Sequence, residues 1–152
     1  MKEKYMRLAL KQAKKALEQD EVPIGAVIVK DGKVIARGYN KTEKTQIALK
    51  HAEVVAIEKA CKKLQSWRLD DCEIYITVEP CAMCAGAIAN ARIKKAYFGA
   101  SEPKSGCAES KYPILTDNGL NHTTEFEGGI LGEECSKLLS GYFKAKRQKN
   151  KK

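Results

Sequence analysis

The segment EIYITVEPCAMCAGAIAN, residues 73–90, joins a buried strand directly to a helix. Residues 73–78 form an apolar run that is rich in β-branched side chains and has the length of a strand. Pro80 suits the first turn of a helix, because a backbone N–H at that position has no partner inside the helix. We therefore predict a strand over 73–78, a helix from Pro80 to Asn90 and a further strand over 95–99 (KAYFG).

The residues before this segment predict a helix, a hairpin and a second helix. Apolar side chains recur at helical spacing near the N-terminus, with lysine and arginine on the opposite side. Asp31-Gly32 separates two apolar runs, and Asp-Gly in that position is a strong hairpin signal. The predicted elements are a helix over 5–19, strands over 23–29 and 33–39, a polar connection over 40–50 and a helix over 51–64.

The residues after the segment predict a long loop and a C-terminal helix. Residues 101–121 contain glycine and proline, and loops of this length in compact domains usually serve a function. A short strand is expected at 123–126 and a helix over 133–149. Helices that alternate with buried strands after one hairpin imply an α/β fold, with a mixed sheet covered by helices on both faces. A chain of 152 residues suffices for one domain, predicted over 1–152.

The chain carries 28 basic and 19 acidic residues, a formal net charge of +9, which indicates an anionic partner such as nucleic acid or a membrane surface. The excess is uneven, since residues 1–20 carry +3, residues 21–136 carry −1 and residues 137–152 carry +7. Charge gathered at the two ends favours a binding patch. A basic surface that only keeps the protein in solution is the alternative.

No apolar run approaches the roughly 20 residues that span a membrane, and the first residues lack the apolar core and cleavage site of a signal peptide. We therefore expect a cytoplasmic protein without a membrane partner. In such a protein the cysteines are reduced, and some of them bind metal. The six cysteines are Cys61, Cys72, Cys81, Cys84, Cys107 and Cys135.

Two short motifs carry metal-binding residue types, and each opens a predicted helix. They are HAE at 51–53 and PCAMC at 80–84. The three-residue spacing puts Cys81 and Cys84 on one helix face, and a helix N-terminus favours their thiolate forms. Two thiolates and the imidazole of His51 suit Zn²⁺ and leave its fourth position open, as in catalytic sites. A structural zinc site would need a fourth ligand, from another cysteine or from the second histidine, and a redox pair is the other interpretation of a lone C-x-x-C.

Glu53 follows His51 by two residues, so it points to another side of the helix and is a poor zinc ligand. A carboxylate at the mouth of the same helix can instead take a proton from a water that the metal acidifies, and pass it to a substrate nitrogen. The alternative is a first-turn acid that complements the helix dipole. The nearby His51, Cys81 and Cys84 favour the proton-transfer role.

H-x-E followed by P-C-x-x-C is the signature of zinc deaminases. From about Tyr5 to Gln148 the chain resembles the bacterial tRNA-specific adenosine deaminase family, part of the zinc-dependent cytidine and deoxycytidylate deaminase superfamily. The motifs shared with this family are EVPIGAV (21–27), GYN (38–40), HAE (51–53), EPCAMCAGA (79–87), RI (92–93), FGA (98–100), KSG (104–106), NH (121–122) and GYFKAKRQ (141–148). Three of them point to tRNA editing: the EVP at 21–23, the NH pair and the aromatic-basic C-terminal segment.

The resemblance implies a three-layer α/β/α cytidine-deaminase-like fold with a central mixed five-stranded sheet. It implies one Zn²⁺ per subunit held by His51, Cys81 and Cys84, with Glu53 as the proton shuttle. Asn40, which by itself would be taken for a turn residue, matches the family position that hydrogen-bonds the target base. The implied reaction is hydrolytic deamination of adenosine to inosine at the wobble position of a tRNA anticodon stem-loop, with release of ammonia. The family is a homodimer, and both subunits contact the RNA.

The chain departs from the family pattern beside the expected site. Residues 47–50 (IALK) stand where the family usually has Asp-Pro-Thr-Ala, and Glu109 stands where glycine is common. We expect these changes to alter the loops around the base pocket. Residues 51–71 would also suit a guanine deaminase, so deamination of a free base or nucleoside, guanine or cytosine, is the alternative function. A non-catalytic zinc module is a third hypothesis, and the presence of Glu53 argues against it.

The C-terminal helix combines aromatic and basic residues. Tyr142 and Phe143 precede Lys144, Lys146 and Arg147. Such residues suit an RNA loop, through base stacking and phosphate contact. A solvated basic tail is the alternative, but a free-base deaminase has no use for this segment, and we expect it to contact RNA.

Overall fold

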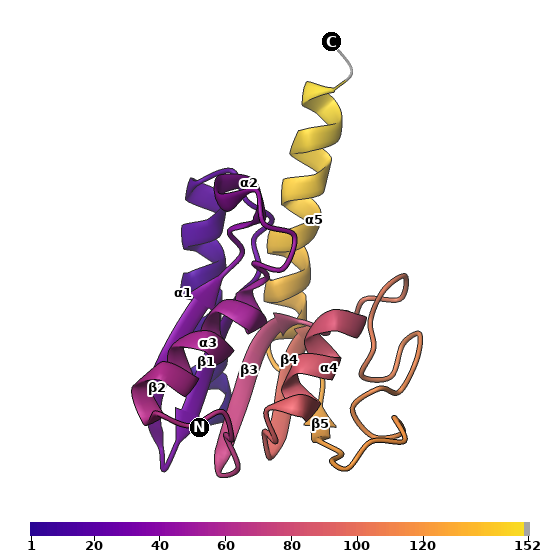
Figure 1. The fold of residues 1–152 in the computed structure, drawn as a ribbon. Helices are drawn as coiled ribbons and strands as arrows, with labels where there is room; N and C mark the ends of the chain where they lie inside the picture. Colours follow the sequence, from indigo (N-terminus) through magenta and orange to yellow (C-terminus); the bar gives the residue numbers. More distant parts are fainter. Residues whose placement is uncertain (151–152) are drawn as a thin grey trace.

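A computed structural model describes residues 1–150, which form a mixed sheet between two layers of helices (Figure 1). The first three strands of the sheet are antiparallel neighbours, and the last three are parallel. The sheet therefore combines the predicted hairpin with β-α-β connections, and the predicted fold class is confirmed. In spatial order the strands are β2 (Lys33–Tyr39), β1 (Gly25–Lys30), β3 (Cys72–Val78), β4 (Lys95–Ala100) and β5 (Glu125–Glu127).

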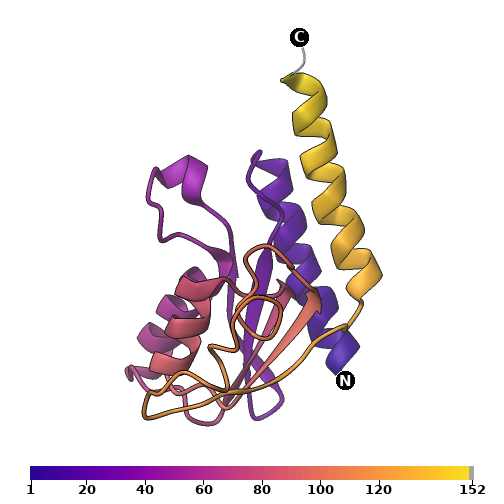
Figure 2. The same ribbon diagram turned by 90° about the vertical axis from the view of Figure 1, so that its right-hand side faces the viewer.

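Four of the five helices cover the two faces of the sheet (Figure 2). α1 (Lys2–Glu18) and α5 (Gly132–Lys149) lie on one face, and α3 (Ala52–Leu64) and α4 (Ala82–Asn90) lie on the other. The C-terminal turns of α5 extend past the body of the protein (Figure 1). The fifth helix, α2 (Thr42–Thr45), is a single turn inside the segment that was predicted to be a polar connection.

Each face of the sheet forms its own apolar core. Ile74 and Ile76 of β3 belong to the core under α3 and α4, because alternate residues of a strand point to opposite faces. Tyr75 belongs to the core under α1 and α5, where its ring stacks on Tyr97 with 4.5 Å between ring centres. Burial on both faces explains why β3 is a continuous apolar run without polar alternation.

The hairpin and the helix starts show how local sequence sets the fold. Asp31 and Gly32 have φ values of 50° and 74°, which form the mirror-image turn that matches strand twist. The helices predicted from His51 and Pro80 begin one and two residues later, at Ala52 and Ala82. His51 and Cys81 are consequently N-cap residues with extended backbone, so their side chains lie at the helix mouths. No helix within residues 1–150 combines the length and apolar character needed to cross a membrane.

The packing of α3 on β2 depends on Gly38. A Cβ atom there would lie 2.5 Å from the carbonyl oxygen of Ala52 and 2.7 Å from the backbone nitrogen of Ala56. Gly38→Ala should therefore lower the free energy of unfolding by about 1–3 kcal/mol in urea denaturation, the usual cost of overpacking. Gly141→Ala is the matched control, because a Cβ there meets no atom within 4 Å. It should leave stability unchanged or raise it by up to about 1 kcal/mol through helix propensity. Equal stability of Gly38→Ala and the wild type would contradict this packing.

Candidate metal centre and active site

His51, Cys81 and Cys84 converge at the end of the sheet where α3 and α4 begin (Figure 1). The Nδ1 atom of His51 lies 3.6 Å from Cys81 Sγ and 3.5 Å from Cys84 Sγ. All three donor atoms lie within 4.8 Å of one another. The structure thus brings His51 next to a pair of cysteines that lie 30 and 33 positions later in the sequence.

The spacing of these atoms fits a tetrahedral metal ion. Zn–S and Zn–N bonds of about 2.3 and 2.0 Å at tetrahedral angles separate the sulfur and nitrogen atoms by about 3.6 Å. Two sulfurs and one imidazole nitrogen also match the ligand preference of Zn²⁺. Within residues 1–150 the group has no fourth ligand from a histidine, cysteine, aspartate or glutamate. His122, one candidate for that position, instead directs Nε2 to the carbonyl oxygen of Ile93 at 2.9 Å. The group can hold one metal ion and leave one position for a ligand.

The local electrostatics favour a thiolate in this group. Hydrogen bonds from the Cys84 thiol and from His51 lower the pKa of Cys81 to about 4, against the opposing effect of burial. The hydrogen bond with Cys81 likewise raises the pKa of His51. The thiol of Cys84 donates to Cys81 and is buried, so its own pKa rises. A site that already favours one thiolate releases fewer protons when a metal binds.

Glu53 lies in the first turn of α3, two residues after His51, and its carboxyl group interacts with His51 and both cysteines. Its side chain is only 3% exposed, and Oε1 has no hydrogen-bond partner within the described residues. A buried oxygen without a partner costs free energy, so it marks a place that a water or substrate completes. Burial raises the pKa of Glu53 to about 7. A carboxyl group with that pKa can both accept and release a proton near neutral pH.

Asn40 follows β2 and is buried next to the start of α3. Its Oδ1 atom accepts a hydrogen bond from the backbone N–H of Ala52 at 2.8 Å. Ala52 stands between His51 and Glu53, so this bond ties the end of β2 to the helix mouth. Nδ2 makes no hydrogen bond within residues 1–150, which leaves it as a donor. The structure therefore gives Asn40 a structural bond and a donor that remains available.

Two buried carboxylates appeared in the sequence motifs without a role. Glu21 is 1% exposed and accepts hydrogen bonds from backbone N–H groups of α2, and Glu79 is 2% exposed and accepts hydrogen bonds from backbone N–H groups of the loop after β4. The available signal was an acidic residue directly after the apolar strand that ends at Val78. A carboxylate at the end of a buried strand is itself buried, and it then needs several donors.

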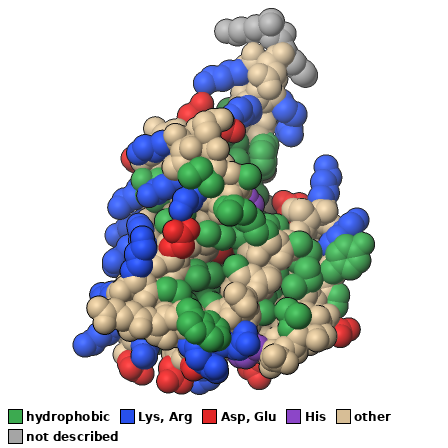
Figure 3. Space-filling view, in the orientation of Figure 1, with side chains coloured by type: hydrophobic (Ala, Val, Ile, Leu, Met, Phe, Trp, Pro, Cys, Tyr) green, Lys and Arg blue, Asp and Glu red, His purple; other side chains and the backbone are tan. Residues whose placement is uncertain are grey.

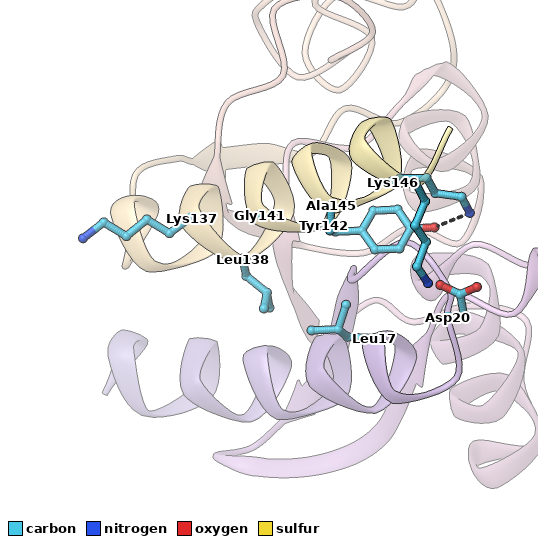
Figure 4. Close-up of a pocket in the computed structure, with 9 residues that line it drawn as sticks. Leu17, Asp20, Lys137, Leu138, Gly141, Tyr142, Ala145 and Lys146 are labelled. Carbon is cyan, nitrogen blue, oxygen red and sulfur yellow. Dashed lines mark hydrogen bonds between the residues drawn. The ribbon is translucent and has the colours of Figure 1, made fainter. Parts of the chain in front are cut away.

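The structure buries most of the Tyr142 side chain. It is 8% exposed and lines the groove between α1 and α5, with its hydroxyl toward Lys146 (Figure 4). Its hydroxyl accepts a hydrogen bond from Lys146 at 2.9 Å. The low exposure of this ring leaves little of its face accessible for stacking on a base. Phe143 is 42% exposed, and Lys144 and Arg147 are exposed as well.

Comparison with known proteins gives this site a family. Residues 1–147 match the family model of MafB19-like deaminases. A tRNA-specific adenosine deaminase of Bacillus subtilis (strain 168) is 47% identical over 149 residues, 98% of this chain and 92% of that protein. One of Haemophilus influenzae is 43% identical over 150 residues, 98% and 87% of the two chains. The chain belongs to the tRNA-specific adenosine deaminase family.

Solved structures place the chain within this deaminase family in the same way. A structure from a study of A-to-I editing by tRNA:A34 deaminases has a TM-score of 0.86 and 43% identity, covering 89% of this chain and 98% of that one. A guanine deaminase from Bacillus subtilis has a TM-score of 0.64 and 36% identity, covering 96% and 93%. The likeness to the tRNA:A34 deaminase structure is greater in both fold and sequence.

The metal centre can be tested by metal content. The purified chain should hold close to one zinc ion per chain by plasma mass spectrometry. Cys84→Ser should hold less than about a tenth of that amount, because only the thiolate is a strong ligand. Cys107→Ser is the matched control, since Cys107 is another buried cysteine but lies outside the donor group. Equal zinc content in Cys84→Ser and Cys107→Ser would contradict the assignment.

Proposed function

We propose that the chain is a zinc-dependent tRNA adenosine deaminase, a hydrolase that acts on the C–N bond of an amidine. Its substrate is the wobble adenosine of a tRNA anticodon, the A34 position named for the related structure, and its products are inosine and ammonia. The observation that carries the proposal is the unpartnered, buried Oε1 of Glu53 beside the donor atoms of His51, Cys81 and Cys84. The tRNA-specific adenosine deaminase relatives support the choice of substrate.

In this proposal His51, Cys81 and Cys84 hold one Zn²⁺ per subunit, which when bound acidifies a water molecule. Glu53 Oε1 accepts a proton from the water and donates it to N1 of adenine, while the water oxygen bonds to C6. The bond between C6 and the exocyclic nitrogen then breaks, and Glu53 transfers the second proton to the departing amine. The pKa of about 7 suits Glu53 to both directions of transfer.

Asn40 is proposed to bind the target base through Nδ2. Its Oδ1 atom is already engaged by the backbone of Ala52, so the amide orientation is fixed and only the NH₂ group remains to donate. A base held there must leave the stack of the anticodon loop before its C6 atom can reach the site. Single-stranded loops allow this at low cost.

The role of Glu53 is tested by Glu53→Gln, which keeps the shape of the side chain and removes its ability to carry a proton. Inosine formation on an anticodon stem-loop with a wobble adenosine should fall by at least about 100-fold, the usual contribution of general acid–base catalysis. Fold and zinc content should be unchanged. Glu3→Gln, at an exposed position in the first turn of α1, is the control and should keep wild-type activity. Wild-type turnover by Glu53→Gln would show that the mechanism is wrong.

The projecting part of α5 is proposed to contact the anticodon stem-loop. Phe143 offers an exposed ring for stacking, and Lys144 and Arg147 offer exposed cations for phosphates. Tyr142 and Lys146, which were also expected to contact RNA, are joined to each other by a hydrogen bond within α5. Lys151 and Lys152, which belong to the same basic tail, lie outside the described residues.

Removal of the exposed α5 groups should weaken RNA binding in a salt-dependent way. The triple change of Phe143→Ala, Lys144→Gln and Arg147→Gln should reduce the slope of log K against log salt by about 0.7 for each lost phosphate contact. Fluorescence anisotropy of a labelled stem-loop over a potassium chloride series measures this slope. Lys94→Gln, an exposed lysine at the far end of the sheet, should leave the slope unchanged. An unchanged slope in the triple variant would contradict the RNA contact.

We further propose that two copies associate through the exposed side of α4. α4 carries no charged residue, and hydrophobic side chains gather on this face (Figure 3). Gly86 lies in the middle of α4, and a Cβ there would meet no atom within 4 Å, so the chain itself does not require glycine. A helix that is apolar on its outer side, with a glycine there, suits close approach by a partner. A tRNA substrate would place the dimer in the cytoplasm.

Deamination of a free base is the second candidate. The likeness to the Bacillus subtilis guanine deaminase supports it, because that protein is 36% identical over nearly the whole chain. The basic, projecting α5 supports the RNA substrate, since a small base needs no such surface. The higher identity of the tRNA-specific relatives favours the same choice.

A further inference from the structure

Two segments flank the metal centre at the end of the sheet (Figure 1). Residues 41–50 connect Asn40 to His51, and the backbone N–H of Lys41 closes this segment by donating to the carbonyl oxygen of Lys50 at 2.9 Å. Residues 101–110 follow β4, and the N–H of Cys107 donates to the carbonyl oxygen of Pro80 at 2.7 Å, next to Cys81. We call these two segments the rim. Apart from the single turn of α2, the rim has no regular structure that would fix its conformation.

Glu79 gathers the second segment of the rim around one buried carboxylate. Its side chain accepts four backbone hydrogen bonds and one from a hydroxyl. Gly106 lies against it, and a Cβ at that position would come within 2.4 Å of the carboxyl carbon of Glu79. The segment can therefore close over Glu79 only with glycine there. The donors are the N–H groups of Glu102 (3.0 Å), Ala108 (3.1 Å), Glu109 (2.8 Å) and Ser110 (2.8 Å), together with the Ser110 hydroxyl.

Glu21 does the same for the first segment. It is 1% exposed, and its two oxygens accept hydrogen bonds from the N–H of Glu43 at 3.0 Å and of Lys44 at 2.7 Å. These are N–H groups of the first turn of α2, which has no side-chain cap of its own. The Glu21 carboxylate, about 20 residues earlier in the chain, thus caps the N-terminal N–H groups of α2, which a neighbouring side chain would normally cap.

We propose that Glu79 and Glu21 are positioning residues that set the geometry of the rim through which the RNA loop enters; this inference rests on the proposed function. Hydrogen bonds from N–H groups to a carboxylate are strong and directional, and a buried carboxylate is stable only where its donors stay in place. Each carboxylate therefore specifies one arrangement of its segment. Neither is placed against the reacting atoms.

The alternative is that both residues only stabilise the fold, and a split between KM and kcat separates the two roles. In Glu79→Gln the amide NH₂ group faces backbone donors, so the segment over 101–110 must rearrange. KM for the stem-loop should rise about tenfold, and kcat should change by less than about threefold. The reason is that the rim affects binding of the RNA loop and does not take part in the chemical step. Zinc content should stay at the wild-type level. Glu21→Gln should raise KM by a smaller factor, since it loses fewer hydrogen bonds.

Val29→Ala is the matched control, because Val29 is buried in β1 and removing its methyl groups destabilises the protein away from the rim. It should lower stability and leave KM unchanged. Ser110→Ala is a milder variant, which removes one donor to Glu79, keeps the protein folded and should raise KM by about threefold. Two results would overturn the positioning role and leave the proposed function intact. One is the same KM in Glu79→Gln, Ser110→Ala and Val29→Ala, and the other is loss of zinc in Glu79→Gln. Failure of the wild type to bind or deaminate the stem-loop would overturn the proposed function, and this role with it.

Discussion

The donor atoms of His51, Cys81 and Cys84 can meet around one ion only if two helices begin at the same point above the sheet. That requirement explains much of the architecture. α3 follows β2 in the chain, and α4 follows β3. The close contact between Gly38 of β2 and the first turn of α3 fixes the position of His51 relative to the sheet. Both His51 and Cys81 are N-caps, so their side chains lie beside the first turns of α3 and α4. The backbone N–H groups of these turns and the helix dipoles favour the thiolate form at the metal centre.

Three buried carboxylates around this centre differ in how they are satisfied, and the difference matches their roles. Glu79 accepts hydrogen bonds from both backbone and hydroxyl, so it is fixed and serves geometry. Glu53 is equally buried, but its Oε1 has no partner within residues 1–150, so it retains the capacity to move a proton. Glu21 resembles Glu79, because both of its oxygens accept backbone hydrogen bonds. The number of hydrogen-bond donors, and not burial, thus separates the proposed proton carrier Glu53 from the two proposed positioning residues.

Local sequence predicted the elements and the metal group well, because their causes are local. The β-branched run of β3, the Asp-Gly turn and the short spacing of Cys81 and Cys84 each act within a few residues. Other features bring together residues that are far apart in the chain. They are the hydrogen bond from Ala52 to Asn40, the hydrogen bonds from residues 102–110 to Glu79 and the groove that Tyr142 lines with Leu17. No periodicity or motif encodes those contacts. The single domain over 1–152 remains a prediction.

The central claim is that this metal centre acts on adenosine in an RNA loop. The most direct measurement compares turnover, by the same zinc-loaded protein, of an anticodon stem-loop with a wobble adenosine, of free guanine and of free cytosine. We expect inosine and an equal amount of ammonia from the stem-loop, with no ammonia from either free base. Turnover of guanine or cytosine without any inosine in the stem-loop would contradict the claim and assign the site to a free-base deaminase.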